Sequence, residues 1–268
     1  FGADRRGDEL PAELQTREGR LVKMREAKAA IEAEAAERAA AEAAAKAREA
    51  GKDDDEIEAA ADEAAKTAVP RPKAQRSFTD PDARMMKTNR GFGYAYNAQA
   101  AADEHSQVIL AGYLTQAPTD INQLLVMLEH INLALAAAGL RQPKRTLADA
   151  GYCSTANIDQ AAGTGHDLVV ATGRLKHHEQ AAAVPKGRIP NSATSRERMA
   201  RRLRTKQGKA DYARRKVIIE PVFGQMKVKQ NAEQLRLRGL VGAQGEWTLH
   251  AICHNLRKLA NATQPAVC

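Results

Sequence analysis

Between Leu10 and Ala50 the sequence contains a single glycine, Gly19, and no proline after Pro11. Most of the other positions hold alanine, glutamate, lysine or arginine, which are among the strongest helix formers. A run of this length without a turn residue predicts one extended helix. The segment from Gly51 to Asp55 then ends that helix, and its aspartates can cap a second helix from Glu56 to about Ala68.

Apolar residues seven positions apart indicate a short coiled-coil seam on the first of these helices. The pairs are Leu14 with Leu21 and Met24 with Ile31, and further along the helix the seam holds only alanine. Residues 1–70 are therefore predicted to form a long, coiled-coil-like helical hairpin. A polar connector, residues 71–90, is predicted to join it to the remainder of the chain.

After the connector the pattern changes to short apolar runs separated by glycines and polar turns. A strand pair is predicted at Gly93–Asp103 and Val108–Leu114, followed by a helix at Asp120–Ala138 and a strand at Arg145–Asp149. A short helix at Thr155–Ala162 and a strand at Asp167–Thr172 come next. Two long helices, Tyr212–Val228 and about Gly245–Ala260, complete the order. Asp120 or Thr119 is expected to cap the first of these helices. This order predicts an α/β domain over residues 91–262, with a mixed sheet flanked by helices.

The net charge of +8 is distributed unevenly along the chain. Residues 1–70 contain 12 Lys/Arg and 18 Asp/Glu, whereas residues 174–238 contain 18 Lys/Arg and 5 Asp/Glu. A polyanion is the natural partner of such a basic surface, and nucleic acid is the commonest one; a merely solvated basic face is the alternative. We expect Arg201, Arg202 and Arg204 to contact DNA phosphates, which gives salt-sensitive binding without sequence preference.

The sequence does not fit a membrane protein or a small protein held together by disulfide bonds. No apolar run approaches the roughly 18 residues that a membrane helix needs, and the first twenty residues are too polar for a signal peptide. The three cysteines, Cys153, Cys253 and Cys268, form no CxxC pair, which argues against a disulfide scaffold and a cysteine zinc site. A soluble, cytoplasmic protein is expected.

Two carboxylates stand beside or within apolar runs. Asp149, in the stretch TLADAGY, ends a predicted strand where α/β sheets place their sites, although it could instead cap the following turn. Glu220 interrupts the run from Val217 to Phe223, where it should be paired or bound to a cation unless it is a salt-bridged surface residue. Carboxylates bind Mg²⁺, so two such acids in a basic chain suggest metal-assisted phosphoryl transfer on nucleic acid.

Four separated blocks make this suggestion specific: YNAQAAADEHSQVILAGYLTQAPTDINQL, TLADAGYCSTANI, RRKVIIEPVFGQMK and LRLRGLVGAQGEWTLHAICHNLRKL. Together they resemble the catalytic part of bacterial insertion-sequence transposases with a DDE, ribonuclease-H-like core, over roughly Asp80 to Ala260. The hairpin resembles the helical insertion of one branch of that group. The resemblance implies an enzyme that uses Mg²⁺ (or Mn²⁺) to hydrolyse phosphodiesters at the transposon ends and to join the 3′ hydroxyl to target DNA. It also implies double-stranded DNA as partner, a homodimer, and association with the bacterial nucleoid.

The resemblance assigns catalytic and metal-binding roles to Asp149, from the family's A-D-x-G-Y strand, and to Glu220, which precedes a Phe-Gly-x-x-K-like run. In similar transposases a first aspartate lies in an Asp-Gly-Thr-like strand before the helical insertion, and this sequence has no such strand. Asp103 could substitute for it, but we expect a plain strand-to-turn aspartate there. The expectation is an inactive C-terminal fragment that lacks the first catalytic strand; a non-catalytic DNA-binding protein or a nuclease without strand transfer are the alternatives.

The wider family signature, Tyr-x2-Arg-x3-Glu-x6-Lys, fits in part. Its lysine falls on Lys227, which is implied to neutralise phosphate. Its arginine falls on Lys216 and its tyrosine on Ala213, while Arg215 and Tyr212 each stand one residue early. The DNA contacts expected on this helix are therefore Tyr212, Arg215, Lys216 and Lys227.

Overall fold

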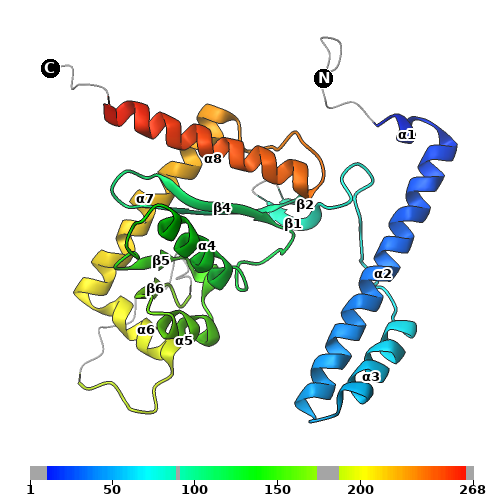
Figure 1. Cartoon of the computed structure of the whole chain (residues 1–268), viewed down its shortest axis with the longest axis horizontal. Helices are drawn as coiled ribbons and strands as arrows, with labels where there is room; N and C mark the ends of the chain where they lie inside the picture. The colour runs from blue at the N-terminus through cyan, green and yellow to red at the C-terminus, as the bar shows by residue number, and fades with distance from the viewer. Residues whose placement is uncertain (1–10, 89–90, 174–186, 264–268) are drawn as a thin grey trace. The chain divides into compact units, whose positions relative to one another are not determined.

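The computed structural model describes residues 11–88, 91–173 and 187–263, and it divides into two compact units (Figure 1). Unit 1 comprises residues 1–95 and unit 2 comprises residues 96–268. The predicted mixed α/β class is confirmed. Within these described ranges the strands form three separate pairs, β1–β2, β3–β4 and β5–β6, where one mixed sheet was expected.

Unit 1 contains the predicted helical hairpin. After a short α1 (Ala12–Gln15), α2 runs from Arg17 to Glu49 and α3 from Asp54 to Lys66. The Asp53 side chain accepts a hydrogen bond from the Glu56 backbone N–H at 2.9 Å, which confirms an aspartate cap on the second helix.

The expected leucine seam is buried only in part. Leu14, in α1, is buried, whereas Leu21 and Met24 of α2 are about half exposed and Ala35 and Ala47 are buried. The reason is length: at about 1.5 Å per residue, the 13 residues of α3 cover less than half of the 33-residue α2. α3 starts just after α2 ends, so it packs on the alanine-rich second half and leaves the apolar first half uncovered.

A β-hairpin closes unit 1. β1 (Arg84–Thr88) pairs with β2 (Gly91–Ala95) in antiparallel register, from Arg84 opposite Ala95 to Thr88 opposite Gly91. β1 lies in the segment that was predicted to be a polar connector, and that prediction was wrong for these residues. The single strand predicted from Gly93 to Asp103 is also divided, because its first part pairs with β1 and its second part pairs with β4.

Unit 2 begins with the predicted strand pair, β3 (Asn97–Ala102) and β4 (Ile109–Thr115), which is antiparallel. Asp103 shapes the turn between them, since its carboxylate accepts hydrogen bonds from the N–H groups of Ser106 (2.7 Å) and Val108 (2.6 Å). This confirms the expectation of a strand-to-turn aspartate.

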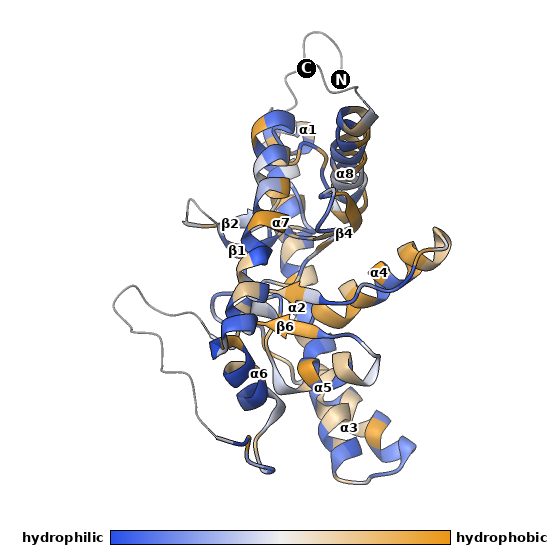
Figure 2. Ribbon diagram, turned by 90° about the vertical axis from the view of Figure 1, so that its left-hand side faces the viewer, coloured by the Kyte–Doolittle hydropathy of each residue, from blue (hydrophilic) through white to orange (hydrophobic). Residues whose placement is uncertain are grey.

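Next come α4 (Leu124–Ala137), β5 (Thr146–Ala148), the single 3₁₀ turn η1 (Ala150–Tyr152), α5 (Thr155–Gly163) and β6 (Leu168–Val170). β5 and β6 are parallel. Figure 2 shows α4 and β6 in the colours of apolar side chains. They belong to one buried cluster, which includes Leu128, Ile131, Ile158, Leu168 and Val170.

Three helices complete unit 2: α6 (Ser195–Arg204), α7 (Lys206–Gln230) and α8 (Leu240–Thr263). α7 contains Pro221, which has no N–H to donate to the carbonyl of Val217 one turn earlier. The Gln107 side chain supplies the missing donor, because its Nε2 lies 2.8 Å from the Val217 oxygen. Gln107 also accepts two hydrogen bonds from α8, one from Lys258 Nζ to its Oε1 (2.7 Å) and one from His254 Nε2 to its backbone oxygen (2.9 Å). The β3–β4 turn is thereby fastened to both α7 and α8.

Candidate active site

Asp149 directly follows β5, as the sequence predicted. Its Oδ1 accepts a hydrogen bond from the Gly151 N–H at 2.7 Å, so the side chain caps η1. Asp149 also lines an open cavity of about 900 Å³ within unit 2. The two interpretations of this residue are therefore compatible, because it caps a turn with one oxygen and lies in the wall of a cavity.

Gly151 allows a second carboxylate to approach. A Cβ at this position would lie 2.9 Å from Asp120 Oδ2 and 3.0 Å from Asp149 Oδ1, so any other residue would force these carboxylates to shift. Since each oxygen is about 3 Å from the same point, the two carboxylates lie within about 6 Å of one another. Asp120 and Asp149 form a carboxylate pair at the end of β5.

A buried amide holds Asp120 in this position. Asp120 Oδ1 accepts hydrogen bonds from Asn97 Nδ2 (2.7 Å) and Gln99 Nε2 (2.9 Å). The Gln99 side chain is only 2% exposed, and its Oε1 accepts the Tyr152 hydroxyl. Buried polar atoms need partners, so Gln99 fixes Asp120 on one side and Tyr152 on the other.

The expected role of Asp120 as a helix cap was therefore wrong. α4 begins at Leu124, and its N-cap residue, Gln123, makes no side-chain capping bond. The Asp120 carboxylate instead accepts hydrogen bonds from two side-chain amides of β3. Each amide also donates to a second oxygen, Asn97 to the Ala117 carbonyl at 3.2 Å and Gln99 to Asn97 Oδ1 at 3.0 Å. The available sequence signal was the pair Asn97 and Gln99, two polar residues on one face of an otherwise small, apolar strand.

The two tyrosines near this pair are hydrogen-bond donors. Burial raises the pKa of Tyr152 far above its ordinary value, and the charges of Asp120 and Asp149 raise it further. Burial likewise raises the pKa of Tyr113 to about 12, with a contribution from Asp120. Both phenols stay protonated at neutral pH, so Tyr152 donates to Gln99 and Tyr113 donates to the Gln123 backbone oxygen at 3.2 Å.

Four charged residues connect the far ends of the strands to α6 and α7. The Asp167 carboxylate forms ion pairs with two guanidinium groups, those of Arg202 (N–O distance 2.5 Å) and Arg145 (2.7 Å). Arg145 also reaches the buried Asp211 at 2.6 Å. The hydrogen bonds from Arg202, followed by those from Arg145, hold the pKa of Asp167 at about 2. The carboxylate therefore stays ionised at neutral pH, and the pairs position α6 and α7 against β5 and β6.

Glu220 lies on the exposed face of α7. Its side chain is 56% exposed and is paired with Arg215 at 3.4 Å. The residues of α7 that line the cavity are different ones: Asp211, Arg214, Arg215, Ile218, Ile219 and Phe223. The structure does not bring Glu220 together with Asp149. Across the described ranges, no three His, Cys, Asp or Glu side chains are grouped closely enough to hold a metal ion.

The residues predicted to contact DNA lie on α6 and α7. Lys216 and Lys227 are exposed, and the Arg215 guanidinium lies 5.8 Å from the centre of the Tyr212 ring. On α6, Arg202 is held by Asp167, Arg204 donates to the Ala200 oxygen at 3.1 Å, and Arg201 donates to the Gly187 oxygen. Arg202 thus has a role within the fold, and DNA contact by any of these seven side chains stays a prediction.

Comparison with known proteins identifies the family. No curated protein and no solved structure matches the chain. Within the described residues, no helix is both long and apolar enough to cross a membrane. The family model described as "Transposase DDE domain" matches residues 66–256, which is more than half of the chain and includes Asp120, Asp149 and Glu220. The chain therefore belongs to the DDE transposase family.

Proposed function

We propose that the chain belongs to a group of insertion-sequence transposases that bind transposon ends, hydrolyse a phosphodiester there and join the 3′ hydroxyl to target DNA, and that this chain supplies the DNA-binding part of that function. The supporting observation is the position of Asp149: at the end of β5, in a cavity wall that also contains Arg214 and Arg215 of α7. A bacterial cytoplasmic location, on the nucleoid when DNA is bound, follows from this substrate.

The exposed face of α7 fits the backbone of DNA. Lys216 and Lys227 are eleven residues apart, which is close to three full turns, so they share one face about 16 Å apart along the axis. Glu220 lies between them on nearly the same face. We assign phosphate contacts to the two lysines, because exposed ammonium groups bind phosphate with little sequence preference.

Asp149 and Glu220, the carboxylates to which the resemblance assigns divalent metal ions, are not brought together here. Asp149 lies beside Asp120, whereas Glu220 faces outward beside Arg215. The donor set therefore does not fit a two-ion centre, and no step through a metal ion follows from this geometry. We propose that the chain, as it stands, binds DNA ends but is inactive in cleavage.

The test is a labelled transposon-end duplex, assayed for binding over a salt series and for cleavage and joining with Mg²⁺ or Mn²⁺. The double variant Lys216→Ala/Lys227→Ala should bind at least tenfold more weakly and should lower the slope of log affinity against log salt by about 2. The double variant Lys28→Ala/Lys52→Ala removes the same charge from exposed positions in unit 1 and is the matched control. Equal weakening by both pairs would contradict the assignment to α7.

The cleavage and joining assays distinguish an inactive chain from an active transposase and from a nuclease. We expect the wild-type chain to bind the duplex and to cleave it no more than the Glu220→Gln variant does. Cleavage with joining that Asp149→Asn and Glu220→Gln both abolish would contradict the proposed inactivity but support the family chemistry. Cleavage without joining identifies a nuclease, and cleavage that neither variant affects removes both residues from the site.

A homodimer is also proposed, and α8 offers a surface for it. Four apolar side chains, Leu249, Ile252, Leu256 and Leu259, are about half exposed or more and follow the 3-4-3 spacing of a coiled-coil seam. The positions that flank such a seam hold no charged side chain, since they are Cys253, Asn255, Ala260 and Ala262. Two copies can therefore pair these faces without like-charge repulsion.

We expect Leu256→Glu to weaken self-association at least tenfold in sedimentation equilibrium, because it places a charge in the centre of the seam. Val241→Glu is the control, since Val241 is more exposed but lies outside the heptad spacing. A wild-type chain that is monomeric at high micromolar concentration would refute this surface.

A further inference from the structure

One face of the β1–β2 hairpin of unit 1 is largely apolar and exposed. Phe92, Tyr94 and Met85 are 78%, 41% and 38% exposed. Successive residues of a strand point to opposite faces, so Phe92 and Tyr94 are on the same face of β2. The strand register places Lys87 opposite Phe92 and Met85 opposite Tyr94. These four side chains therefore form one surface, the aromatic face of the hairpin.

The opposite face of the hairpin is the one that attaches it to unit 1. Arg84 donates a hydrogen bond to Glu34 of α2 at 2.7 Å, and Met86, two residues further along the same face, is only 6% exposed. Ala95 and Gly93, which lie opposite these two residues, add only small side chains. The hairpin is thus held by one face, and its aromatic face points away from the α2 contact.

Exposed aromatic rings are rare in this chain. Among the residues that the structure describes, the exposed Phe, Tyr and Trp side chains are Phe78, Phe92 and Tyr94, and two of these three are on the aromatic face. A single exposed apolar residue needs no explanation, but a contiguous apolar group on a surface marks an interaction site. Two rings and a methionine on one side of a ten-residue hairpin are such a group.

The charge of the hairpin indicates what kind of molecule this face binds. β1 and β2 contain two basic residues, Arg84 and Lys87, and no acidic residue. Lys87 is exposed on the aromatic face, directly opposite Phe92. An apolar protein surface would bury this ammonium group without a counter-charge, which is costly. A strand of nucleic acid supplies a phosphate for the lysine and a base for the ring, the combination found where single strands are bound.

The spacing of the two rings favours unpaired bases over a duplex. Phe92 and Tyr94 are two residues apart on β2, so their Cα atoms are about 6.8 Å apart. Successive bases of a DNA duplex are stacked about 3.4 Å apart and cover the faces of one another. They therefore cannot stack on both rings, whereas the bases of a single strand can separate and each take one ring.

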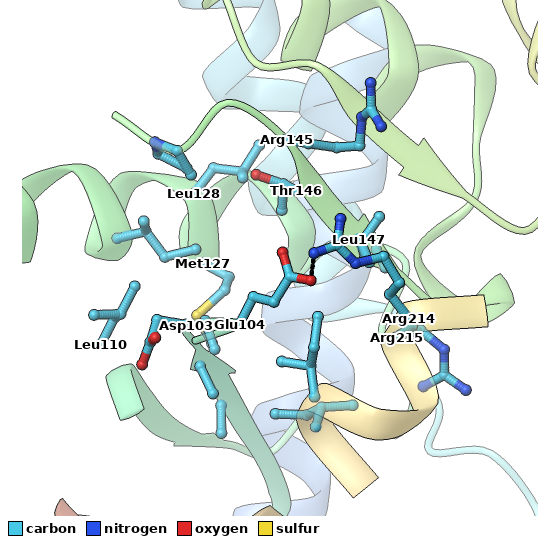
Figure 3. A pocket seen from close by; sticks show the side chains of 18 of the residues that line it. Asp103, Glu104, Leu110, Met127, Leu128, Arg145, Thr146, Leu147, Arg214 and Arg215 are labelled. Atoms are coloured by element: carbon cyan, nitrogen blue, oxygen red, sulfur yellow. Dashed lines mark ion pairs between the residues drawn. The ribbon is translucent and has the colours of Figure 1, made fainter. Parts of the chain in front are cut away.

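The cavity of unit 2 is less suited to this ligand. Figure 3 shows two of its arginines, Arg145 and Arg214, together with a dashed line for the ion pair between Arg214 and Glu104. Arg145 is likewise paired, with Asp167 at 2.7 Å. These guanidinium groups are neutralised by carboxylates of the fold itself, so a phosphate would have to displace those carboxylates in order to bind.

We propose that the aromatic face of the β1–β2 hairpin binds unpaired nucleotides of single-stranded DNA. Two bases stack on Phe92 and Tyr94, and Lys87 binds a phosphate. The inference goes beyond the proposed function, because both the ligand and the unit differ from those of the duplex contacts assigned to α7. It rests on the proposed function only for the choice of DNA as the nucleic acid.

The test compares two fluorescent probes on the full chain, an oligothymidine of about 12 nucleotides and an abasic strand with the same number of phosphates. The wild type should bind the thymidine probe at least tenfold more tightly than the abasic probe at equal salt. Phe92→Leu should reduce this ratio at least threefold, because leucine is apolar but has no ring, and Phe92→Trp should restore it. Phe78→Leu removes an exposed ring outside the hairpin and, as the matched control, should leave the ratio unchanged.

Lys87→Ala tests the phosphate contact separately from the bases. It should weaken the binding of both probes by the same factor and lower the slope of log affinity against log salt by about 0.7, the value for one phosphate of a single strand. Lys52→Ala, at another exposed position of unit 1, is the control and should change neither quantity.

Three results would overturn the proposal: a wild-type ratio near one, a ratio that Phe92→Leu does not change, and a ratio that Phe78→Leu lowers to the same extent. The double variant Lys216→Ala/Lys227→Ala should weaken both probes together and leave the ratio as it is in the wild type. A failure of the α7 assignment and a failure of this proposal are therefore observed in different variants and with different probes.

Discussion

Replacement of Trp247 by alanine is expected to lower the free energy of unfolding of unit 2 by about 3–5 kcal/mol, the usual effect of removing a buried aromatic ring. Trp247 is 4% exposed and stacks on Phe223 with ring centres 6.1 Å apart. Its Nε1 donates to the Gln99 oxygen at 3.3 Å and lies so close to Gly112 that a Cβ there would be 3.2 Å away. The loss therefore combines a cavity with a missing hydrogen bond between α8 and β3.

The measurement is hydrogen exchange of the slowest amides of β4, which report global opening of unit 2. Val241→Ala is the control on the same helix, because Val241 is 88% exposed and its truncation should cost no more than about 0.5 kcal/mol. A similar loss in both variants would mean that α8 does not pack on the β3–β4 pair through Trp247.

The second large effect is expected for Gln99→Glu, which keeps the shape of the side chain but changes its chemistry. The atom that donates to Asp120 at 2.9 Å becomes a second carboxylate oxygen in a position that is 2% exposed. Two acids in contact in a buried position cannot both ionise without a large penalty. We expect a destabilisation of about 3 kcal/mol or more at pH 8.

The pH dependence of this variant has a defined sign. Repulsion from Asp120 and burial would raise the folded-state pKa of the introduced glutamate above its unfolded value of about 4.3. The penalty is then full above the folded pKa and falls as pH drops toward the unfolded pKa, so Gln99→Glu should recover stability relative to the wild type between pH 8 and pH 5. Gln160→Glu, at an exposed position on α5, is the control and should show neither effect. A pH-independent loss would show that Gln99 acts only through packing.

The parts of the fold that the sequence predicts well are those that local chemistry determines. The hairpin of α2 and α3 follows from helix propensity and from the Asp53 cap, and the strand that comes directly before Asp149 follows from a short apolar run before a glycine. The turn at Asp103 is local as well, because its carboxylate bonds amides three and five residues away.

The parts that could not be predicted depend on contacts between distant residues. Nothing near Asp120 shows that its partners are Asn97 and Gln99, which are 23 and 21 residues away. Likewise, the division of one predicted strand at Tyr96 depends on which neighbours its two halves pair with. For Glu220 the sequence left two positions open, and the structure has the salt-bridged surface residue. The sequence could not decide between them, because an apolar run on a helix does not say which face is covered.

The attachment of the β3–β4 turn to the last helix also affects synthesis of the chain. Gln107 and Lys258 are 151 residues apart, and the side chains that cover the edge of β4 belong to α8 as well. At 5–20 residues per second, a ribosome needs roughly 8–30 s to add the intervening residues. During that interval α8 cannot cover the nascent β4 edge, so this hairpin is exposed to wrong strand pairing until translation reaches α8.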